Sequence, residues 1–440
     1  LSRFSLYYPE KRPFFLERAS IFDINLGANN TLFYSRRIGL SNDGDPIRIY
    51  GGARMIGRVG KWDLAMLDMQ TAPLKMKNSS GIYEEILPSE NFGVLRFRRQ
   101  VINENSYIGA GFTSRLGANG HYNIGYGLDG IFRLFRQDYL DLKFAQTFET
   151  GAVSSYFFKP TRIALDWTRR STKGLGYTMG YSYSGLNFNP GIGFEMLDDY
   201  YSGRLAILYG WIPGEDSKLY SHAVEFRTRG SAYLSDGSLM TNSNTIGWRF
   251  TTKNQWQGEV SIVHNIENLK DSLILIEDEA YVLPGKYEFV NFMGMGSTPA
   301  SSPFFIMLMT EAGQFFDGRR FSIELQPTWN ISKHFELGGT YGFDHLNFAG
   351  RDMVITNHIV GVKTLYMLNI KLSVNAFLQY NTAEHSVISN LRLRYNPKEG
   401  NDFYLVFNEG RNTSLTREEP NLPVYSSRAV MMKYTYTFNL

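Results

Sequence analysis

Apolar and polar residues alternate with a period of two along most of this chain. Between residues 321 and 329, for example, Phe321, Ile323 and Leu325 alternate with polar neighbours, and residues 430–440 repeat the pattern. Successive side chains of a β-strand point to opposite faces, so each such segment predicts a strand with two different faces. Many segments continue for about nine residues or more, whereas soluble strands typically have about five or six and bilayer-spanning strands about 9 to 11.

Connections of two lengths separate these segments. Short ones lie at 60–62, 169–174, 213–218, 252–255, 331–334 and 396–402, and longer polar ones at 72–90, 188–200, 266–285 and 409–426. Outer-membrane barrels combine tight periplasmic turns with long external loops. The sequence therefore predicts an all-β fold, a transmembrane antiparallel β-barrel of about 22 strands (range about 20 to 24), with both termini periplasmic. An even count makes residues 31–40 the first strand, which leaves 1–30 as a lead-in segment and 31–440 as the barrel.

The composition argues against several other classes of protein. No stretch approaches the roughly 18 consecutive apolar residues of a membrane-spanning helix. The 45 basic and 42 acidic residues leave a net charge of +3, which gives no reason to expect a nucleic-acid partner. Because the chain has no cysteine, it has neither a disulfide framework nor a thiolate metal site.

The tryptophans provide an independent indication of a membrane protein. All of them lie within a few residues of a connection assigned as short, and indole rings favour the membrane–water interface. We therefore expect a periplasmic aromatic girdle. Its members are Trp62, Trp167, Trp211, Trp248, Trp256 and Trp329.

The N-terminal part of the chain resembles a known family. The run YYPEKRPFFLE at 7–17 is followed by LFYSRRIG at 32–39 and GGARMIGRVGKWDLAMLDMQT at 51–71. This pattern is similar to that of Bacteroidota outer-membrane barrel proteins of unassigned function, whose full-length members carry an N-terminal domain similar to carbohydrate-binding family 9. The segment LERASIF departs from the family, which more often has glycine after FLE. The resemblance implies an outer-membrane location and no established reaction, and no ligand residue of that domain carries over.

The opening segment is stiff and carries charges and aromatic rings. Pro9 and Pro13 fix φ and bias the residues before them toward extended conformations. Ionised side chains are costly against lipid but stable in a polar lumen. We expect the segment to dock in the periplasmic opening, with its charges paired to lumen residues and its phenylalanines as anchors; the alternative is a solvated linker. The candidate docking residues are Glu10, Lys11, Arg12, Phe14, Phe15 and Glu17.

Several arginines lie two positions apart and therefore share a strand face. Facing inward, they would form basic ladders, balanced by Glu324, Glu336, Asp141 and Asp166. One interpretation is a lumen that attracts anions. The other, favoured by the balanced total charge, is a charge network that fills and rigidifies a wide barrel. The candidate lumen residues are Arg96, Arg98, Arg392 and Arg394, with Arg227 and Arg229 as a third pair.

No catalytic or metal-binding pattern stands out. Asp344 and His345 form an adjacent acid–histidine pair, but neighbours on a strand point to opposite faces, which favours a polar loop end. Asp43 and Asp45 resemble a calcium loop that lacks its final glutamate, so a simple turn is the better account. The acidic residues 277–279 could bridge cations to lipopolysaccharide or form a solvated loop. We expect no cofactor, no metal and no enzymatic activity.

Three classes of function remain open at this point. The expectation is a non-enzymatic outer-membrane barrel that anchors a periplasmic carbohydrate-binding-like domain or belongs to a larger assembly. The first alternative is a channel or uptake barrel for saccharides or other small solutes, and the second is a barrel hydrolase. Expected partners are outer-membrane lipid, lipopolysaccharide and possible outer-membrane or periplasmic proteins, with no nucleic acid.

Overall fold

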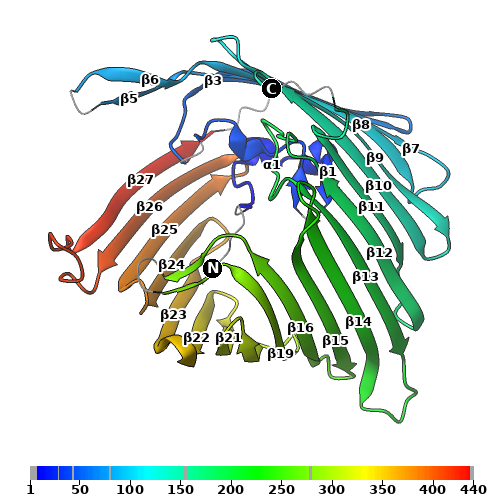
Figure 1. The fold of residues 1–440 in the computed structure, drawn as a ribbon. Helices are drawn as coiled ribbons and strands as arrows, with labels where there is room; N and C mark the ends of the chain where they lie inside the picture. Colours follow the sequence, from blue (N-terminus) through cyan, green and yellow to red (C-terminus); the bar gives the residue numbers. More distant parts are fainter. Residues whose placement is uncertain are drawn as a thin grey trace. The chain divides into compact units, whose positions relative to one another are not determined.

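The computed structural model describes residues 7–27, 29–41, 44–78, 81–152, 156–276 and 280–436. These residues form almost only strands, as the alternation predicts (Figure 1). No helix in the described ranges is long and apolar enough to cross a membrane. The chain divides into two compact units, residues 1–208 with 227–242 and residues 209–226 with 243–440, and each is described by itself.

Among the described residues, 21 strands belong to one large antiparallel sheet, within the predicted range. In the first half of the sequence they are β3 (Ile49–Val59), β4 (Trp62–Thr71), β7 (Glu90–Gln100), β8 (Tyr107–Gly117), β9 (Tyr122–Phe135), β10 (Asp138–Glu149), β11 (Thr161–Arg169), β12 (Gly174–Ser184), β13 (Tyr200–Trp211) and β14 (Leu219–Tyr233). The others are β15 (Leu239–Thr252), β16 (Gln257–Leu269), β19 (Gly285–Ser297), β20 (Phe304–Phe315), β21 (Gly318–Ser332), β22 (Phe335–Phe348), β23 (Met353–Met367), β24 (Leu372–Asn381), β25 (Ser386–Lys398), β26 (Asn401–Asn412) and β27 (Tyr425–Thr435).

The strands of the first unit have two clearly different faces. Strands β3, β4 and β7 to β12 pair in this order, antiparallel throughout. One face, here called the docking face, includes Ala65, Leu67 and Met69 of β4, all of them buried. The other face carries large apolar side chains that are 36–53% exposed, among them Met66, Phe97, Phe112, Leu128, Leu142 and Leu165. This alternation is what a sheet with lipid on one side requires.

The described residues between 7 and 48 lie on the docking face and are called the docked segment. It contains α1 (Pro13–Leu16), α2 (Ala19–Phe22), the hairpin β1 (Asn25–Gly27) with β2 (Asn30–Thr31), and the 3-10 turn η1 (Ser35–Arg37) (Figure 1). The prediction of a first sheet strand over 31–40 is therefore wrong, and the large sheet begins at Ile49. Thr31 pairs instead with Phe194 of the connection before β13.

The second unit contains the pairings from β16 through β19 to β27, in sequence order. Its buried cluster lies around a small hairpin, β17 (Leu273–Ile276) with β18 (Ala280–Val282). Val282 and Leu275 of this hairpin pack against Phe348 and Leu346 at the end of β22. A further short segment, η2 (Ala349–Arg351), follows β22.

The predicted connection lengths agree with the observed strand ends. Each of the six segments predicted to be short joins two sheet strands, for example 60–62 between β3 and β4. The long segment at 72–90 contains a hairpin of its own, β5 (Leu74–Lys77) with β6 (Tyr83–Leu87). All six tryptophans lie near the short connections and are 37–52% exposed; that this end is periplasmic stays a prediction.

Candidate functional site

Apolar side chains fix the docked segment to the sheet. Phe15 and Phe22 pack with Ile38 against β4 and β7 of the docking face, where they meet Leu67 and Phe92. Phe22 is 3% exposed and Phe15 is 8% exposed. Burying an aromatic side chain of this size stabilises the packed state by about 1.5–3 kcal/mol. Phe14, the other expected anchor, remains 44% exposed.

A second apolar cluster continues the contact along the sheet. Ile24, Leu26 and Leu32 pack against Ala145 of β10 and against Phe188. Small residues on the strands make room for them: a Cβ added to Gly111 would overlap Ile24, and one added to Gly125 would lie 2.8 Å from Leu32 Cδ1. The glycines of β8 and β9 therefore permit the close approach of the docked segment.

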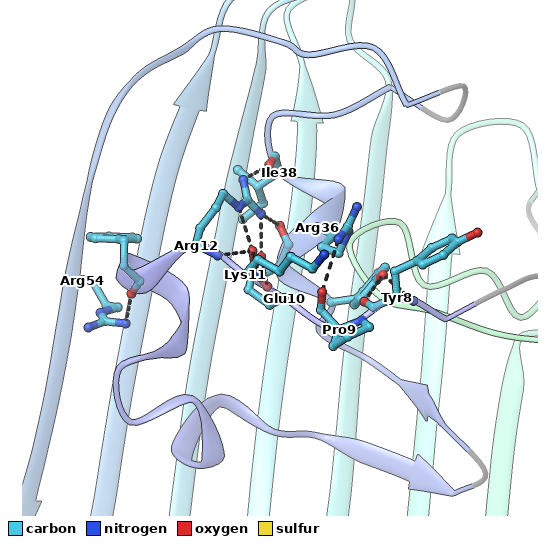
Figure 2. Close-up of polar contacts among 11 residues, drawn as sticks. Tyr8, Pro9, Glu10, Lys11, Arg12, Arg36, Ile38 and Arg54 are labelled. Atoms are coloured by element: carbon cyan, nitrogen blue, oxygen red, sulfur yellow. Dashed lines mark hydrogen bonds and ion pairs between the residues drawn. The ribbon is translucent and has the colours of Figure 1, made fainter. Parts of the chain in front are cut away.

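The charged residues of the opening motif pair mainly within the segment (Figure 2). Arg12 Nη2 lies 2.7 Å from Glu10 Oε2, and Arg12 also donates to the carbonyl oxygens of Ser35 and Ile38, at 2.7 Å each. Burial opposes ionisation of Glu10, but hydrogen bonds from Arg12 and Ser35 lower its pKa to about 2. This network ties the start of the segment to η1. The Lys11 amide also donates to Glu10.

One strand residue of the sheet holds the helical turn of the segment. Arg54 of β3 lies 2.6 Å from the Glu17 carboxylate and donates to the carbonyl oxygens of Phe14 and Glu17. Its guanidinium also lies over the Phe14 ring, 4.9 Å from the centroid. Of the predicted docking charges, Glu17 is thus paired with the sheet, while Glu10 and Arg12 pair with each other.

A buried ion pair lies beneath the docked segment. Arg96 of β7 and Asp129 of β9 form two hydrogen bonds, one of 2.8 Å, and their side chains are 1% and 4% exposed. Gly109 leaves room for the guanidinium, since a Cβ there would lie 2.6 Å from Arg96 Nη1. Asp23 of the docked segment lies near this pair, and burial raises the pKa of Asp23.

The other candidate arginines have partners that differ from the expected ones. Arg98 pairs with Asp63 at 2.8 Å, and Arg394 pairs with Asp402 of the next strand at 2.7 Å. Arg392, on β25 between Asn375 and Val406, is exposed. Of the acids expected to balance these arginines, Asp141 pairs with Lys143, and Asp166 pairs with Arg204. Arg96 and Arg98 do share the docking face.

The connection 185–199, here called the clasp, forms hydrogen bonds with the docked segment, a contact that the sequence did not reveal. The Thr31 and Phe194 backbones exchange two hydrogen bonds of 2.8 Å, and the Tyr34 amide donates to the Ile192 carbonyl at 2.7 Å. Met196 N donates to Asn30 Oδ1 at 2.9 Å. Through these hydrogen bonds the clasp and the docked segment form one layer.

The clasp contains a buried carboxylate. Glu195 lies 3.5 Å from Arg162 of β11, whose side chain is fully buried and also donates to Tyr200 Oη at 2.7 Å and to the Leu26 carbonyl at 3.4 Å. Burial raises the pKa of Glu195 to about 7, with Arg162 opposing the shift and Asp198 adding to it. In this arrangement Glu195 therefore titrates near neutral pH.

The attachment of the clasp should weaken as pH rises from about 5 to 7. The attached clasp raises the pKa of Glu195, so in this pH window the molecule binds more protons with the clasp attached than with it detached. Lower pH therefore favours attachment, by up to about tenfold per pH unit. The measurement is the hydrogen-exchange protection of the Thr31 and Tyr34 amides, corrected for intrinsic rates. Glu195→Gln should flatten the profile; an unchanged slope in this variant would contradict the assignment.

A polar pocket lies where the docked segment, the clasp and four strand ends meet. Its volume is about 280 Å³. Arg37 comes from the docked segment, and the Asn189, Pro190 and Gly191 residues come from the clasp. The strand ends supply Glu90, Arg115, His121, Tyr122, Asn123, Glu149 and Thr150. Arg37 and Arg115 carried no sequence signal beyond their charge.

The remaining candidates for chemistry do not converge. Asp344 pairs with Arg320 at 2.6 Å, whereas His345 contacts Thr356 at 2.9 Å. In the described part of the chain, no group of three or more His, Cys, Asp or Glu residues could hold a metal ion. Asp45 receives a hydrogen bond from Ser41, while Asp43 and residues 277–279 lie outside the described residues.

Comparison with known proteins shows the fold. No family model and no curated protein matches the sequence. The siderophore receptor PirA from Pseudomonas aeruginosa matches with 10% identity and a TM-score of 0.54, over 89% of this chain and 79% of that one. The copper transporter OprC matches with 8% identity over the same shares, also with a TM-score of 0.54.

These similarities overturn one expectation. The expectation of a barrel that merely anchors a periplasmic domain or belongs to an assembly is wrong, because the similar solved structures are a receptor and a transporter. The uptake alternative fits them better, and none of them is an enzyme. The chain has the fold of an outer-membrane β-barrel and belongs in the outer membrane.

Proposed function

We propose that this protein is an outer-membrane uptake barrel for small solutes, whose passage is controlled by the docked segment. The observation that carries the proposal is the packing of residues 7–48 on one face of the first unit's strands, through Phe15, Phe22 and the clasp. In a barrel fold the face opposite the lipid-exposed one lines the interior. The docked segment would therefore occupy part of the interior.

The charges of the docking face support an interior position. A fully buried pair such as Arg96 with Asp129 is costly against lipid but stable in a protein-filled lumen. The exposed face of the same strands has large apolar side chains instead. On this proposal, the arginines stabilise and rigidify the filled interior rather than attract anions.

We also propose contact with anionic lipid headgroups, including lipopolysaccharide, at the long-connection end of β26 and β27. Arg411 and Arg428 flank Glu409 there, with Arg428 lying 2.6 Å from its carboxylate. Arg428 also lies 3.8 Å from the Tyr425 ring centroid. Arginine and tyrosine together are typical of membrane interfaces, where one side of a residue is wet.

Removing residues 7–17 should open the passage. The deletion takes away Phe15 and the Glu10–Arg12 network, so the rest of the docked segment loses a large part of its anchorage. In planar bilayers and in proteoliposomes, we expect higher ion conductance and faster entry of small neutral solutes than with the full chain. Unchanged conductance and flux would mean that this stretch is a linker and would refute its role in control.

A further inference from the structure

The polar pocket beside the docked segment is built from rigidly held groups. Arg115 donates from Nε and Nη2 to the two oxygens of Glu90, each at 2.8 Å, and from Nη1 to the Gly191 carbonyl at 3.3 Å. Such a bidentate pair has a fixed orientation. The pocket wall formed by β7 and β8 is thus ordered before any ligand arrives.

The opposite wall is held by two asparagines. Asn123, which is 8% exposed, accepts from the Gly191 amide at 2.9 Å and donates to Glu149 at 3.1 Å and to the Asn189 carbonyl at 2.9 Å. Asn189 donates to the same Glu149 oxygen at 2.8 Å. These bonds fix the clasp residues on the strand ends and place a carboxylate at the pocket wall.

The charges of the pocket balance. Two arginines, Arg37 and Arg115, and two glutamates, Glu90 and Glu149, line the pocket, so the formal charges of these four side chains sum to zero. A balanced site gives no net attraction for a multiply charged anion. It offers donors and acceptors side by side on planar groups, which suits hydroxyl groups because each one donates and accepts.

The size of the pocket limits the ligand. The pocket volume is about 280 Å³. Pockets for drug-sized ligands start at about 300 Å³. A single sugar ring or a short polyol has dimensions that suit this volume.

We infer that this pocket binds a small, neutral, hydroxyl-rich solute such as a monosaccharide, with Glu149 as acceptor and Arg37 as donor. The inference rests on the proposed uptake function, since it names the solute class and its site of capture. Arg37 belongs to the docked segment, and its guanidinium donates to the clasp at the Gly193 carbonyl, at 3.2 Å. A bound solute would therefore contact both parts of the layer that covers the docking face.

Calorimetric titration of the purified full chain in detergent tests the inference. The probes are D-glucose, D-galactose and D-mannose as neutral sugars, and D-glucuronate and inorganic phosphate as anions. At least one neutral sugar should bind, and Glu149→Gln and Arg37→Gln should each weaken that binding by about tenfold or more. The matched control is Glu84→Gln, an exposed carboxylate of β6 bonded to Asn78, which should leave affinity unchanged.

Two results would overturn the inference: no binding of any neutral sugar, or tighter binding of an anion than of every neutral sugar. If Glu149→Gln fails to fold, Arg37→Gln still tests the inference. Arg37 lies in η1 of the docked segment and not in a strand of the sheet, so its replacement should leave the sheet folded. Flux in proteoliposomes separates this inference from the proposed function. Sugar binding without any solute flux would leave the pocket assigned and the uptake function refuted, and flux without sugar binding would do the reverse.

Discussion

Phe22→Ala should greatly increase the fraction of molecules in which the docked segment is released from the sheet. Phe22 is 3% exposed and packs against β4 and β7. Truncating a buried phenylalanine costs about 3–5 kcal/mol, which shifts the docked-to-released ratio by roughly two to four orders of magnitude. Because the chain has no cysteine, a single thiol at Ala65→Cys reports release. Its maleimide labelling should accelerate by about the same factor.

Phe14→Ala in the same Ala65→Cys background is the matched control. Phe14 lies in α1, the other short helix of the docked segment, and is 44% exposed. Its cation–π contact with Arg54 of the sheet is worth about 0.5–1 kcal/mol, and its edge-on contact with the Phe15 ring lies within α1 itself. Labelling should therefore change by less than about tenfold. Equal labelling rates in the Phe22 and Phe14 variants would contradict the packing described for the docked segment.

Arg96→Met should destabilise the protein by about 3–5 kcal/mol, because it leaves the Asp129 carboxylate buried without its cation. Asp23 of the docked segment also lies near this site. The free energy of unfolding can be followed by tryptophan fluorescence in denaturant, in detergent micelles. The expected loss is large relative to a typical stability of about 5–15 kcal/mol.

Two controls show whether the loss comes from the buried charge. Arg394→Met removes an ion pair whose arginine is 46% exposed, and it should cost less than about 1 kcal/mol. The double variant Arg96→Met with Asp129→Leu removes both charges and should recover most of the stability. If Arg96→Met lowers the free energy of unfolding no more than Arg394→Met does, the stability of the protein does not depend on the buried ion pair.

The two-residue alternation predicted the sheet because it is a local property of strands between lipid and a polar interior. Phe321, Ile323 and Leu325 lie on β21 as expected, and the short connections occur where polar turn residues interrupt the pattern. The shared face of Arg96 and Arg98 also follows from local geometry. These features needed no knowledge of contacts between distant residues.

Residues 31–40 show where local pattern fails. Their alternation resembles that of a strand, but Thr31 pairs with Phe194 and Ser35–Arg37 forms a 3-10 turn. The assignment rested on the need for an even number of strands. What decides the real structure is packing of Leu32 and Ile38 against a sheet that is formed mostly by later residues.

The partners at the candidate site could not be predicted for the same reason. Arg96 meets Asp129, and Arg162 meets Glu195, only through strand register and the fold of the clasp. Composition offered several acids for each arginine, and the balanced charge total did not choose among them. The pocket likewise joins residues from six separate stretches of the chain.

Cross-linking tests most directly whether the docked segment lies on the sheet. A Cβ at Gly27 would lie 3.6 Å from the Ala164 Cβ on β11, within the range of about 3.5–4.5 Å for disulfides. Gly44 has the same φ of +90° but no atom within 4 Å of its added Cβ, so it is a control with equal backbone strain. In outer membranes oxidised before extraction, the Gly27→Cys with Ala164→Cys variant should form an intramolecular disulfide, and Gly44→Cys with Ala164→Cys should not. No disulfide in the first pair, or equal yields in both, would contradict the docked arrangement.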